Sequence, residues 1–254
     1  MLKKIITYTM FAICLAAFGA YCWFCETLIV QGEDTQVCEE ISITILDSTE
    51  NHLVSDESVR EMISRLGNPV GTGIRNVNVH FLENGINGMG AIKKTEVAID
   101  NSGILHIEIT QRHPILRFQK QYEGYYMDDT GFTFPLSDLF TSDVPIVSGY
   151  IREDDTSWRN GMKELGTFLD SHQFWHTQIE QINVSDDGTL NLYSRTSGQT
   201  VLFGLPENIP SKFEKLLAYY KNIAPNYGWD YYSVIDLKYN GQIVCTKSKK
   251  RDKQ

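Results

Sequence analysis

The sequence is poor in cysteine and lacks several of the motifs that build common catalytic or metal sites. It holds five cysteines, and only Cys38 and Cys245 lie outside the apolar N-terminal segment, so they do not form a disulfide framework. A bridge between these two would need an oxidising compartment and a proximity that the spacing does not establish. No glycine-rich phosphate loop, nucleophile elbow, His-Glu-x-x-His sequence or zinc-ribbon spacing occurs. We therefore expect no catalytic residue, no cofactor, no metal site and no small-molecule substrate.

Two weaker chemical signals have simpler explanations. His172 and His176 have the i, i+4 spacing of metal ligands, but no third ligand is indicated. Asp128 and Asp129 could be paired catalytic acids. They precede Thr-Gly, however, and this pattern is typical of a turn. The prediction remains that the protein is not an enzyme.

Basic residues are also scarce. The formal net charge is -9, from 23 Lys and Arg against 32 Asp and Glu. A nucleic-acid partner would require a basic face, so this composition argues against one. The one basic cluster, residues 247–254, is predicted to be a disordered, solubilising tail.

One long uncharged run, residues 5–25, predicts a transmembrane helix. Its 21 residues would span about 31 Å as a helix at ~1.5 Å per residue, which matches the core of a bilayer. Lys3 and Lys4 precede it, so we expect a cytoplasmic tail at 1–4 and the body outside the cytoplasm. The alternative is a cleaved signal peptide, but the apolar run continues beyond the weak cleavage site at 17–19. A linker is predicted at 26–36.

Residues 37–110 predict a small α+β domain with the order strand, helix, helix, strand, strand. Apolar residues alternate with polar ones at 41–45, 95–99 and 105–110, which indicates half-buried strands. Ser55 can cap a first helix, and a second helical pattern runs from Ile74 to Ile86. Two helices would then cover one face of a three-stranded sheet.

A change of pattern at residues 111–118 marks the joint between two domains. The alternation stops at Gln111, and Pro114 cannot donate a ladder hydrogen bond. A new apolar run starts at Ile115. Arg112 and Pro114 are candidate determinants of the joint. Arg112 could pair with an acid across the domain interface or remain solvated, and the sequence leaves both alternatives open.

Residues 111–246 predict a β-rich domain with a mostly antiparallel sheet flanked by two helices. The last two strands, 231–238 and 242–246, surround the good hairpin turn at 239–241. A terminal strand is often a sheet edge, and an exposed edge can accept a partner strand. Ordinary core and cross-strand pairing is the alternative reading of the same residues. The candidate partner-binding residues are Tyr231, Tyr232, Val234, Tyr239, Gln242 and Val244.

An ordered set of segments resembles the FtsQ family of bacterial cell-division proteins, called DivIB in Gram-positive bacteria, in its Bacteroidota form. The likeness covers nearly the whole chain. The segments that carry it are 111–115, 125–131 with Pro135, 178–184, 203–204, 212–220, 228–239 and 242–245.

The resemblance implies a single-pass type II inner-membrane protein with a POTRA domain followed by a β domain in the periplasm. It implies a non-enzymatic scaffold of the divisome that helps to control septum assembly. It also implies that the last strand pairs with a strand of small coiled-coil division proteins of the FtsB/FtsL type. The alternatives are a POTRA-containing envelope assembly or secretion factor and an anchored envelope enzyme.

Overall fold

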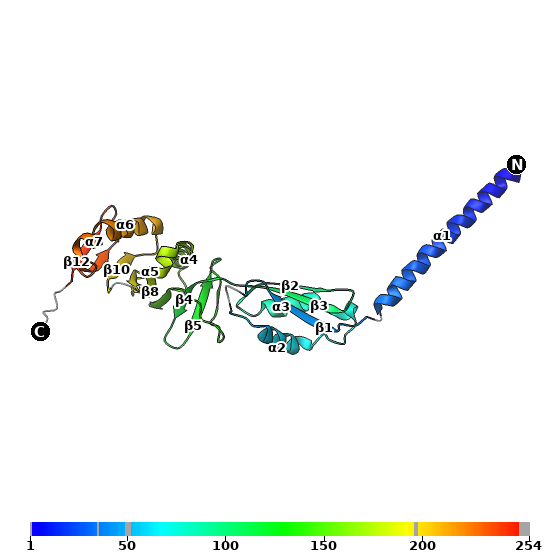
Figure 1. Cartoon of the computed structure of the whole chain (residues 1–254), viewed down its shortest axis with the longest axis horizontal. Helices are drawn as coiled ribbons and strands as arrows, with labels where there is room; N and C mark the ends of the chain where they lie inside the picture. The colour runs from blue at the N-terminus through cyan, green and yellow to red at the C-terminus, as the bar shows by residue number, and fades with distance from the viewer. Residues whose placement is uncertain (1, 35, 49–51, 196–197, 249–254) are drawn as a thin grey trace. The chain divides into compact units, whose positions relative to one another are not determined.

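The computed structural model describes the backbone of residues 2–34, 36–48, 52–195 and 198–248, and their side chains except at 2–9 and 27–34. The chain divides into two compact units, Met1–Ser48 with Val54–Gln111 and Thr49–Leu53 with Arg112–Gln254. Figure 1 colours both units in chain order from blue to red. Most of the predicted tail at 247–254 lies outside the described residues.

The first unit begins with a long helix, α1 (Leu2–Asp34). Every side chain from residue 10 to residue 24 is exposed, including large apolar ones such as Phe11 and Trp23. Cys22 and Cys25, one turn apart in a Cys-x-x-Cys spacing, are free thiols. In the part of the chain that the structure describes, no helix meets the length and hydropathy that a membrane crossing requires. The predicted span at 5–25 includes side chains outside the described residues, and it stays a prediction.

The remainder of the first unit is built on a three-stranded sheet with the strand order β1-β3-β2. β1 runs parallel to β3, and β2 runs antiparallel to it. Leu105, Ile107 and Ile109 form one fully buried face of β3, as their alternation predicted. The predicted order of strand, helix, helix, strand, strand is confirmed. The elements are β1 (Glu40–Ile45), α2 (Asp56–Gly67), the 3-10 helix η1 (Ile74–Asn76), α3 (Val79–Asn87), β2 (Ile92–Ile99) and β3 (Ile104–Gln111).

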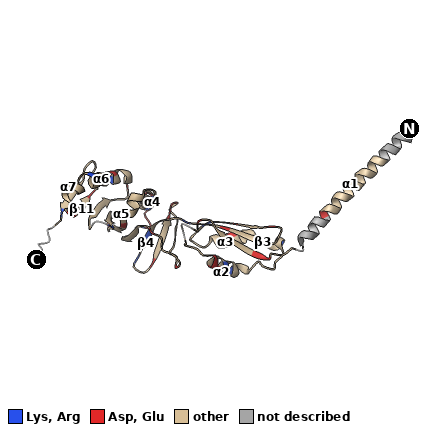
Figure 2. Cartoon of the chain, in the orientation of Figure 1, with Lys and Arg blue, Asp and Glu red and all other residues tan. Residues whose placement is uncertain are grey.

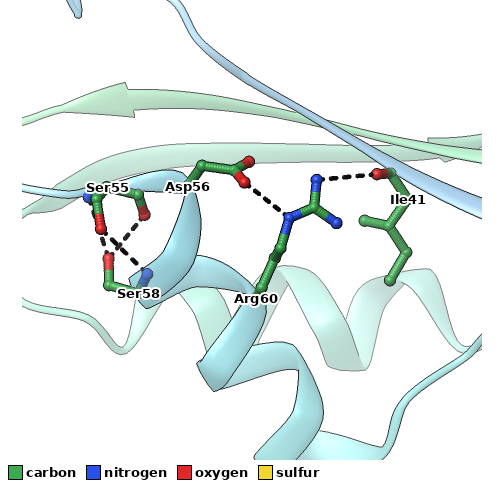
Figure 3. Close-up of polar contacts among 5 residues, drawn as sticks. All are labelled: Ile41, Ser55, Asp56, Ser58 and Arg60. Atoms are coloured by element: carbon green, nitrogen blue, oxygen red, sulfur yellow. Dashed lines mark hydrogen bonds and ion pairs between the residues drawn. The ribbon is translucent and has the colours of Figure 1, made fainter.

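α2 begins at the predicted cap. The Ser55 hydroxyl accepts a hydrogen bond from the Ser58 N–H at 3.2 Å, and the Ser58 hydroxyl accepts one from the Ser55 N–H at 3.1 Å (Figure 3). This reciprocal pair satisfies two backbone donors that the start of a helix leaves free. Val59 and Ile63, one helical turn apart, then bury the apolar face of α2.

A side chain on the surface of α2 contacts the edge of the sheet. Arg60 Nε lies 2.7 Å from Asp56 Oδ2, and its Nη2 donates to the carbonyl of Ile41 at 3.3 Å (Figure 3). β1 is an edge strand of this sheet, so the guanidinium covers one of its acceptors. Acidic and basic residues share α2, as the two colours in Figure 2 show.

The second helix of this unit is shorter than predicted. Asn78 accepts a hydrogen bond from the Phe81 N–H at 3.0 Å and starts α3 at Val79, while Ile74 belongs to the separate turn η1. Phe81 is exposed, and of the predicted apolar positions within α3 only Leu82 and Ile86 are buried. The Asn78 cap thus divides a run of apolar residues whose spacing alone predicted one continuous helix.

The second unit is organised around a nine-stranded sheet with the order β12-β11-β10-β9-β8-β7-β4-β5-β6. The pairs β4·β7, β7·β8 and β10·β11 are parallel. The other five neighbouring pairs are antiparallel. The strands are β4 (Pro114–Gln119), β5 (Gly124–Asp128), β6 (Thr133–Pro135), β7 (Ile146–Gly149), β8 (Ile179–Val184), β9 (Leu190–Ser194), β10 (Thr200–Gly204), β11 (Tyr232–Asp236) and β12 (Val244–Lys247).

The described residues of this unit form four helices instead of the predicted two. The two long ones are at the predicted places, and each is followed by a short one. These helices are α4 (Thr156–Ser171), α5 (Gln173–Gln178), α6 (Ile209–Asn222) and α7 (Ala224–Tyr227). α4–α5 join the parallel strands β7 and β8, and α6–α7 join the parallel strands β10 and β11. Parallel neighbours need such a crossover connection, which explains why the sheet is mixed.

The core of the second unit lies between this sheet and its long helices. Trp158, Met162, Leu165 and Leu169 bury the predicted face of α4. α6 buries Phe213, Leu216 and Tyr220 of its predicted face in the same hydrophobic cluster. Tyr219 also belongs to this cluster, and Lys212 is buried on the same helix. The sheet that these helices cover ends at β12.

Candidate functional site

β12 is the outermost strand at one end of the nine-stranded sheet, and β11 is its neighbour among the described strands. The Ser248 N–H donates to the Tyr231 carbonyl at 2.9 Å, so this part of the backbone faces β11. Backbone N–H groups alternate between the two edges of a strand. The Val244 N–H therefore faces β11, and those of Cys245 and Lys247 point outward. The outer edge of β12 offers backbone groups that no described strand uses.

β11 lies inside the sheet, which corrects the prediction that its residues belong to an edge. Val234 is in register with Thr200 of β10 on one side and with Thr246 of β12 on the other. Tyr232 is half-buried and packs against the core. Tyr231 immediately precedes β11 and is exposed. These three residues can contribute side chains to a binding surface but no free backbone edge, and their role in binding stays a prediction.

The remaining predicted residues lie in or beside the exposed hairpin. Tyr239 and Gln242 are exposed in the connection between β11 and β12, and Val244 is exposed at the start of β12. The Tyr239 carbonyl accepts a hydrogen bond from Lys215 Nζ at 2.7 Å, so this connection is attached to α6. The structure brings these three residues together on one hairpin.

An exposed aromatic patch lies at the start of β11 and adds Tyr227 and Trp229, which were not predicted from the sequence, to the predicted Tyr231. We call Tyr227, Trp229 and Tyr231 the aromatic patch; they are 59%, 50% and 36% exposed. The rings of Tyr227 and Tyr231 stack with centroids 5.4 Å apart, and Lys247 Nζ of β12 lies 5.2 Å from the Tyr231 ring. Exposed tyrosine and tryptophan beside a free strand edge are typical of binding surfaces. The signal in the sequence was the aromatic density of residues 227–232.

Arg112, predicted at the joint, forms an ion pair inside the second unit. Its Nη1 donates to Asp128 Oδ2 at 2.7 Å, and its guanidinium carbon lies 3.8 Å from the centre of the Phe132 ring. Asp128 is fully buried, and its Oδ1 also accepts hydrogen bonds from the N–H groups of Thr130 and Phe132, both at 2.9 Å. Burial alone would raise the pKa of Asp128, but hydrogen bonds from Thr130, Arg112 and Phe132 outweigh it and the pKa is lowered.

Pro114 is the first residue of β4 and is buried beside this ion pair. It is in register with Asp128 at the end of β5. A proline at the first position of a strand costs no ladder bond within the strand. The Arg112–Asp128 pair and Pro114 therefore fix how β4 starts, which is a structural role within the second unit. Their role as a domain joint stays a prediction.

The chemistry of enzymes or metal centres has little support in the described residues. No group of three or more His, Cys, Asp or Glu side chains among them could hold a metal ion. One pocket of 270 Å³ is lined by residues that include Phe118, Tyr125 and Trp158. Glu153 is the one acidic residue in its lining. Burial, with the neighbouring Glu153, raises the pKa of Tyr125, so its hydroxyl stays protonated.

The two units match two known classes of domain. Residues 36–110 match the POTRA-like domain, in agreement with the strand, helix, helix, strand, strand order of the first unit. Residues 113–246, which cover more than half of the chain, match the family described as FtsQ/DivIB, C-terminal related. The chain belongs to this FtsQ/DivIB family, a family of membrane-anchored, non-enzymatic scaffolds of cell division. No curated protein sequence matches the chain.

Proposed function

We propose that the protein is a bitopic inner-membrane scaffold of the bacterial divisome. Its body would lie in the periplasm and bind other division proteins, and β12 would add to its sheet a strand of a small FtsB- or FtsL-type protein. Membership of the FtsQ/DivIB family supports a role in division. The observation that carries the docking mode is the free outer edge of β12 next to the aromatic patch.

The membrane anchor is supported by the surface of α1. A helix that is apolar all round is unstable in water unless it is covered, and a bilayer is one such cover. The side chains from residue 10 to residue 24 are uncovered and without charge, although they include Phe11, Leu15 and Phe18. Lys3 and Lys4 before the run favour a cytoplasmic N-terminus.

The docking mode is supported by the kinds of group that β12 and its surroundings present. A partner strand laid along β12 would accept from the N–H groups of Cys245 and Lys247, since these point outward. Main-chain bonds of this kind give affinity, and side-chain contacts give specificity. Tyr231 and Trp229 would provide large aromatic contacts at the end of the edge.

A proline at position 245 tests the docking mode. Proline is tolerated on an edge strand when its nitrogen faces solvent, so Cys245→Pro should fold while losing one outward donor. Cys245→Val is the matched control, because it keeps the N–H and a similar side chain. We expect Cys245→Pro to weaken binding of the FtsB-type protein of the same cell about tenfold or more in a titration with the full-length chain, and Cys245→Val to bind normally. Equal binding by both variants, with the fold intact, would exclude strand addition at β12.

Orientation is tested separately with an engineered cysteine. Tyr122 is 91% exposed in the second unit, so Tyr122→Cys in a chain whose native cysteines are replaced by serine gives one accessible thiol. A membrane-impermeant maleimide should label it in cells with a permeabilised outer membrane. Labelling that requires lysis of the inner membrane would refute the proposed topology.

A further inference from the structure

The last two strands are attached to the sheet by a short ladder. β10 and β11 are in register over three residue pairs, from Thr200 with Val234 to Leu202 with Asp236. One further bond runs from the Leu237 N–H to the Leu202 carbonyl at 2.9 Å. β12 has β11 as its neighbour among the described strands, so its position depends on that of β11. A two-stranded hairpin is marginal by itself, so contacts other than the ladder must contribute to holding it.

Lys215 of α6 holds the end of β11. Its Nζ donates to the Leu237 carbonyl and to the Tyr239 carbonyl, each at 2.7 Å. Leu237 directly follows β11, and Tyr239 lies in the connection to β12. A charged amine between two carbonyls forms stronger hydrogen bonds than a neutral donor does. This contact fixes the hairpin to the helix that supports the sheet.

Gln199, the residue before β10, holds the start of β11. It is 2% exposed, and its Nε2 donates to the carbonyls of Trp229 at 2.7 Å and Tyr232 at 3.1 Å. The Tyr219 hydroxyl of α6 lies 3.0 Å from the same nitrogen. One buried amide therefore connects α6, the aromatic patch and the first residue of β11. Its Oε1 is buried with no hydrogen-bond partner among the described residues, so this amide acts through its nitrogen.

We infer that Lys215 and Gln199 are positioning residues for the docking strand: they hold the two ends of β11 and so present β12 in the geometry that a partner strand needs. The binding role of Lys215 and Gln199 rests on the proposed docking at β12. Their hold on β11 is a property of the free protein. The hold on β11 and the affinity for a partner can therefore be measured separately.

The first measurement is hydrogen exchange on the full-length chain in lipid nanodiscs without a partner. Lys215→Met and Gln199→Leu remove the donors and keep comparable side-chain volume. We expect each to raise the exchange rate of residues 231–248 about tenfold or more, because a hydrogen bond to a charged or fully buried group is worth at least that factor in local opening. Exchange in α4 and β8 should not change. Lys215→Arg keeps a cationic donor and should restore most of the protection.

Lys212→Met is the matched control. Lys212 is one turn earlier on α6 and also donates from Nζ to a carbonyl, at 2.8 Å, but its acceptor is Leu205, which follows β10. Lys212 is 7% exposed, and burial lowers its pKa. Exchange of 231–248 should stay unchanged in this variant. If Lys215→Met and Lys212→Met behave alike, the assignment of Lys215 as a positioning residue is wrong.

The second measurement is the affinity for the FtsB-type protein. When the docking strand is partly displaced, the apparent Kd rises as the intrinsic Kd divided by the competent fraction. The combined Lys215→Met and Gln199→Leu variant should weaken binding by the factor that its open fraction predicts. If exchange shows that residues 231–248 are open for most of the time in this variant while the Kd is unchanged, the positioning role stands and docking at β12 is overturned. Unchanged exchange in both single variants would overturn the positioning role, whatever the affinity.

Discussion

The buried carboxylate of Asp128 gives the sharpest test of how the second unit is held together. Asp128→Asn keeps the shape and the Oδ1 acceptor that Thr130 and Phe132 use. It replaces Oδ2, which accepts from Arg112 at 2.7 Å, by an NH₂ group that faces another donor. Asp128→Ala removes both oxygens and leaves the Arg112 guanidinium, 16% exposed, without this carboxylate.

The structure sets the expected magnitudes. Loss of a hydrogen bond to a charged group costs about 1.5–3 kcal/mol, which is our expectation for Asp128→Asn. Removing one partner of a buried ion pair costs about 3–5 kcal/mol, which we expect for Asp128→Ala. Arg112→Met combined with Asp128→Asn should cost less than the sum of the single changes, because neither charge is then left alone.

Tryptophan fluorescence in a urea titration measures these changes in the second unit. Trp158, Trp175 and Trp229 all lie in that unit, and the first unit has one tryptophan, Trp23 in α1. The folded pKa of Asp128 is lowered, so its stabilising contribution is present above its unfolded pKa of about 4 and is lost as the pH falls toward the folded pKa. The difference between the native chain and Asp128→Asn should therefore be largest near pH 7 and shrink below about pH 4. A difference that is negligible at pH 7, or that grows in acid, would refute the role of the ion pair.

Three further outcomes are expected. Ser55→Ala should lower the stability of the first unit by about 1 kcal/mol, seen as faster hydrogen exchange at the start of α2, while Ser55→Asp should retain the cap. Gly149→Ala should destabilise the second unit by about 2 kcal/mol or more, because Gly149 has a φ of 96° and a Cβ there would meet the Val184 carbonyl; a urea midpoint equal to that of the native chain would contradict this. Depletion of the protein should give filamentous cells that segregate DNA but do not constrict, and normal division after clean deletion would count against a divisome scaffold.

Features that depend on neighbours along the chain could be predicted from the sequence. The Ser55 cap, the buried face of β3 and the apolar face of α4 all follow from local chemistry or from periodicity. The break between η1 and α3 was also local, but Asn78 sits within a run whose apolar spacing continues through it. Periodicity alone could not tell a cap from an interior position there.

The predicted sheet was mostly antiparallel, in agreement with five of its eight neighbouring pairs, but the order of elements in the sequence also indicated where parallel pairs lie. A strand, a helix and a further strand in sequence favour a parallel crossover, and both 146–184 and 200–236 follow that order. The side-chain contacts that depend on this topology could not be predicted from the sequence. Lys215 meets the Leu237 carbonyl, and Gln199 meets the Trp229 carbonyl, only once α6 has crossed between β10 and β11. The pairing of Arg112 with Asp128 likewise depends on the register of β4 and β5.

The two ends of the nine-stranded sheet are unequal, and this bears on the number of partners. β6 at one end has three residues and finishes in Pro135, which has no N–H to offer. β12 at the other end keeps the outward N–H groups of Cys245 and Lys247. A short, proline-terminated edge resists strand addition, so two copies of this sheet have no matching pair of edges by which to extend head to tail. Docking by strand addition would therefore use one edge and give one partner strand for each chain.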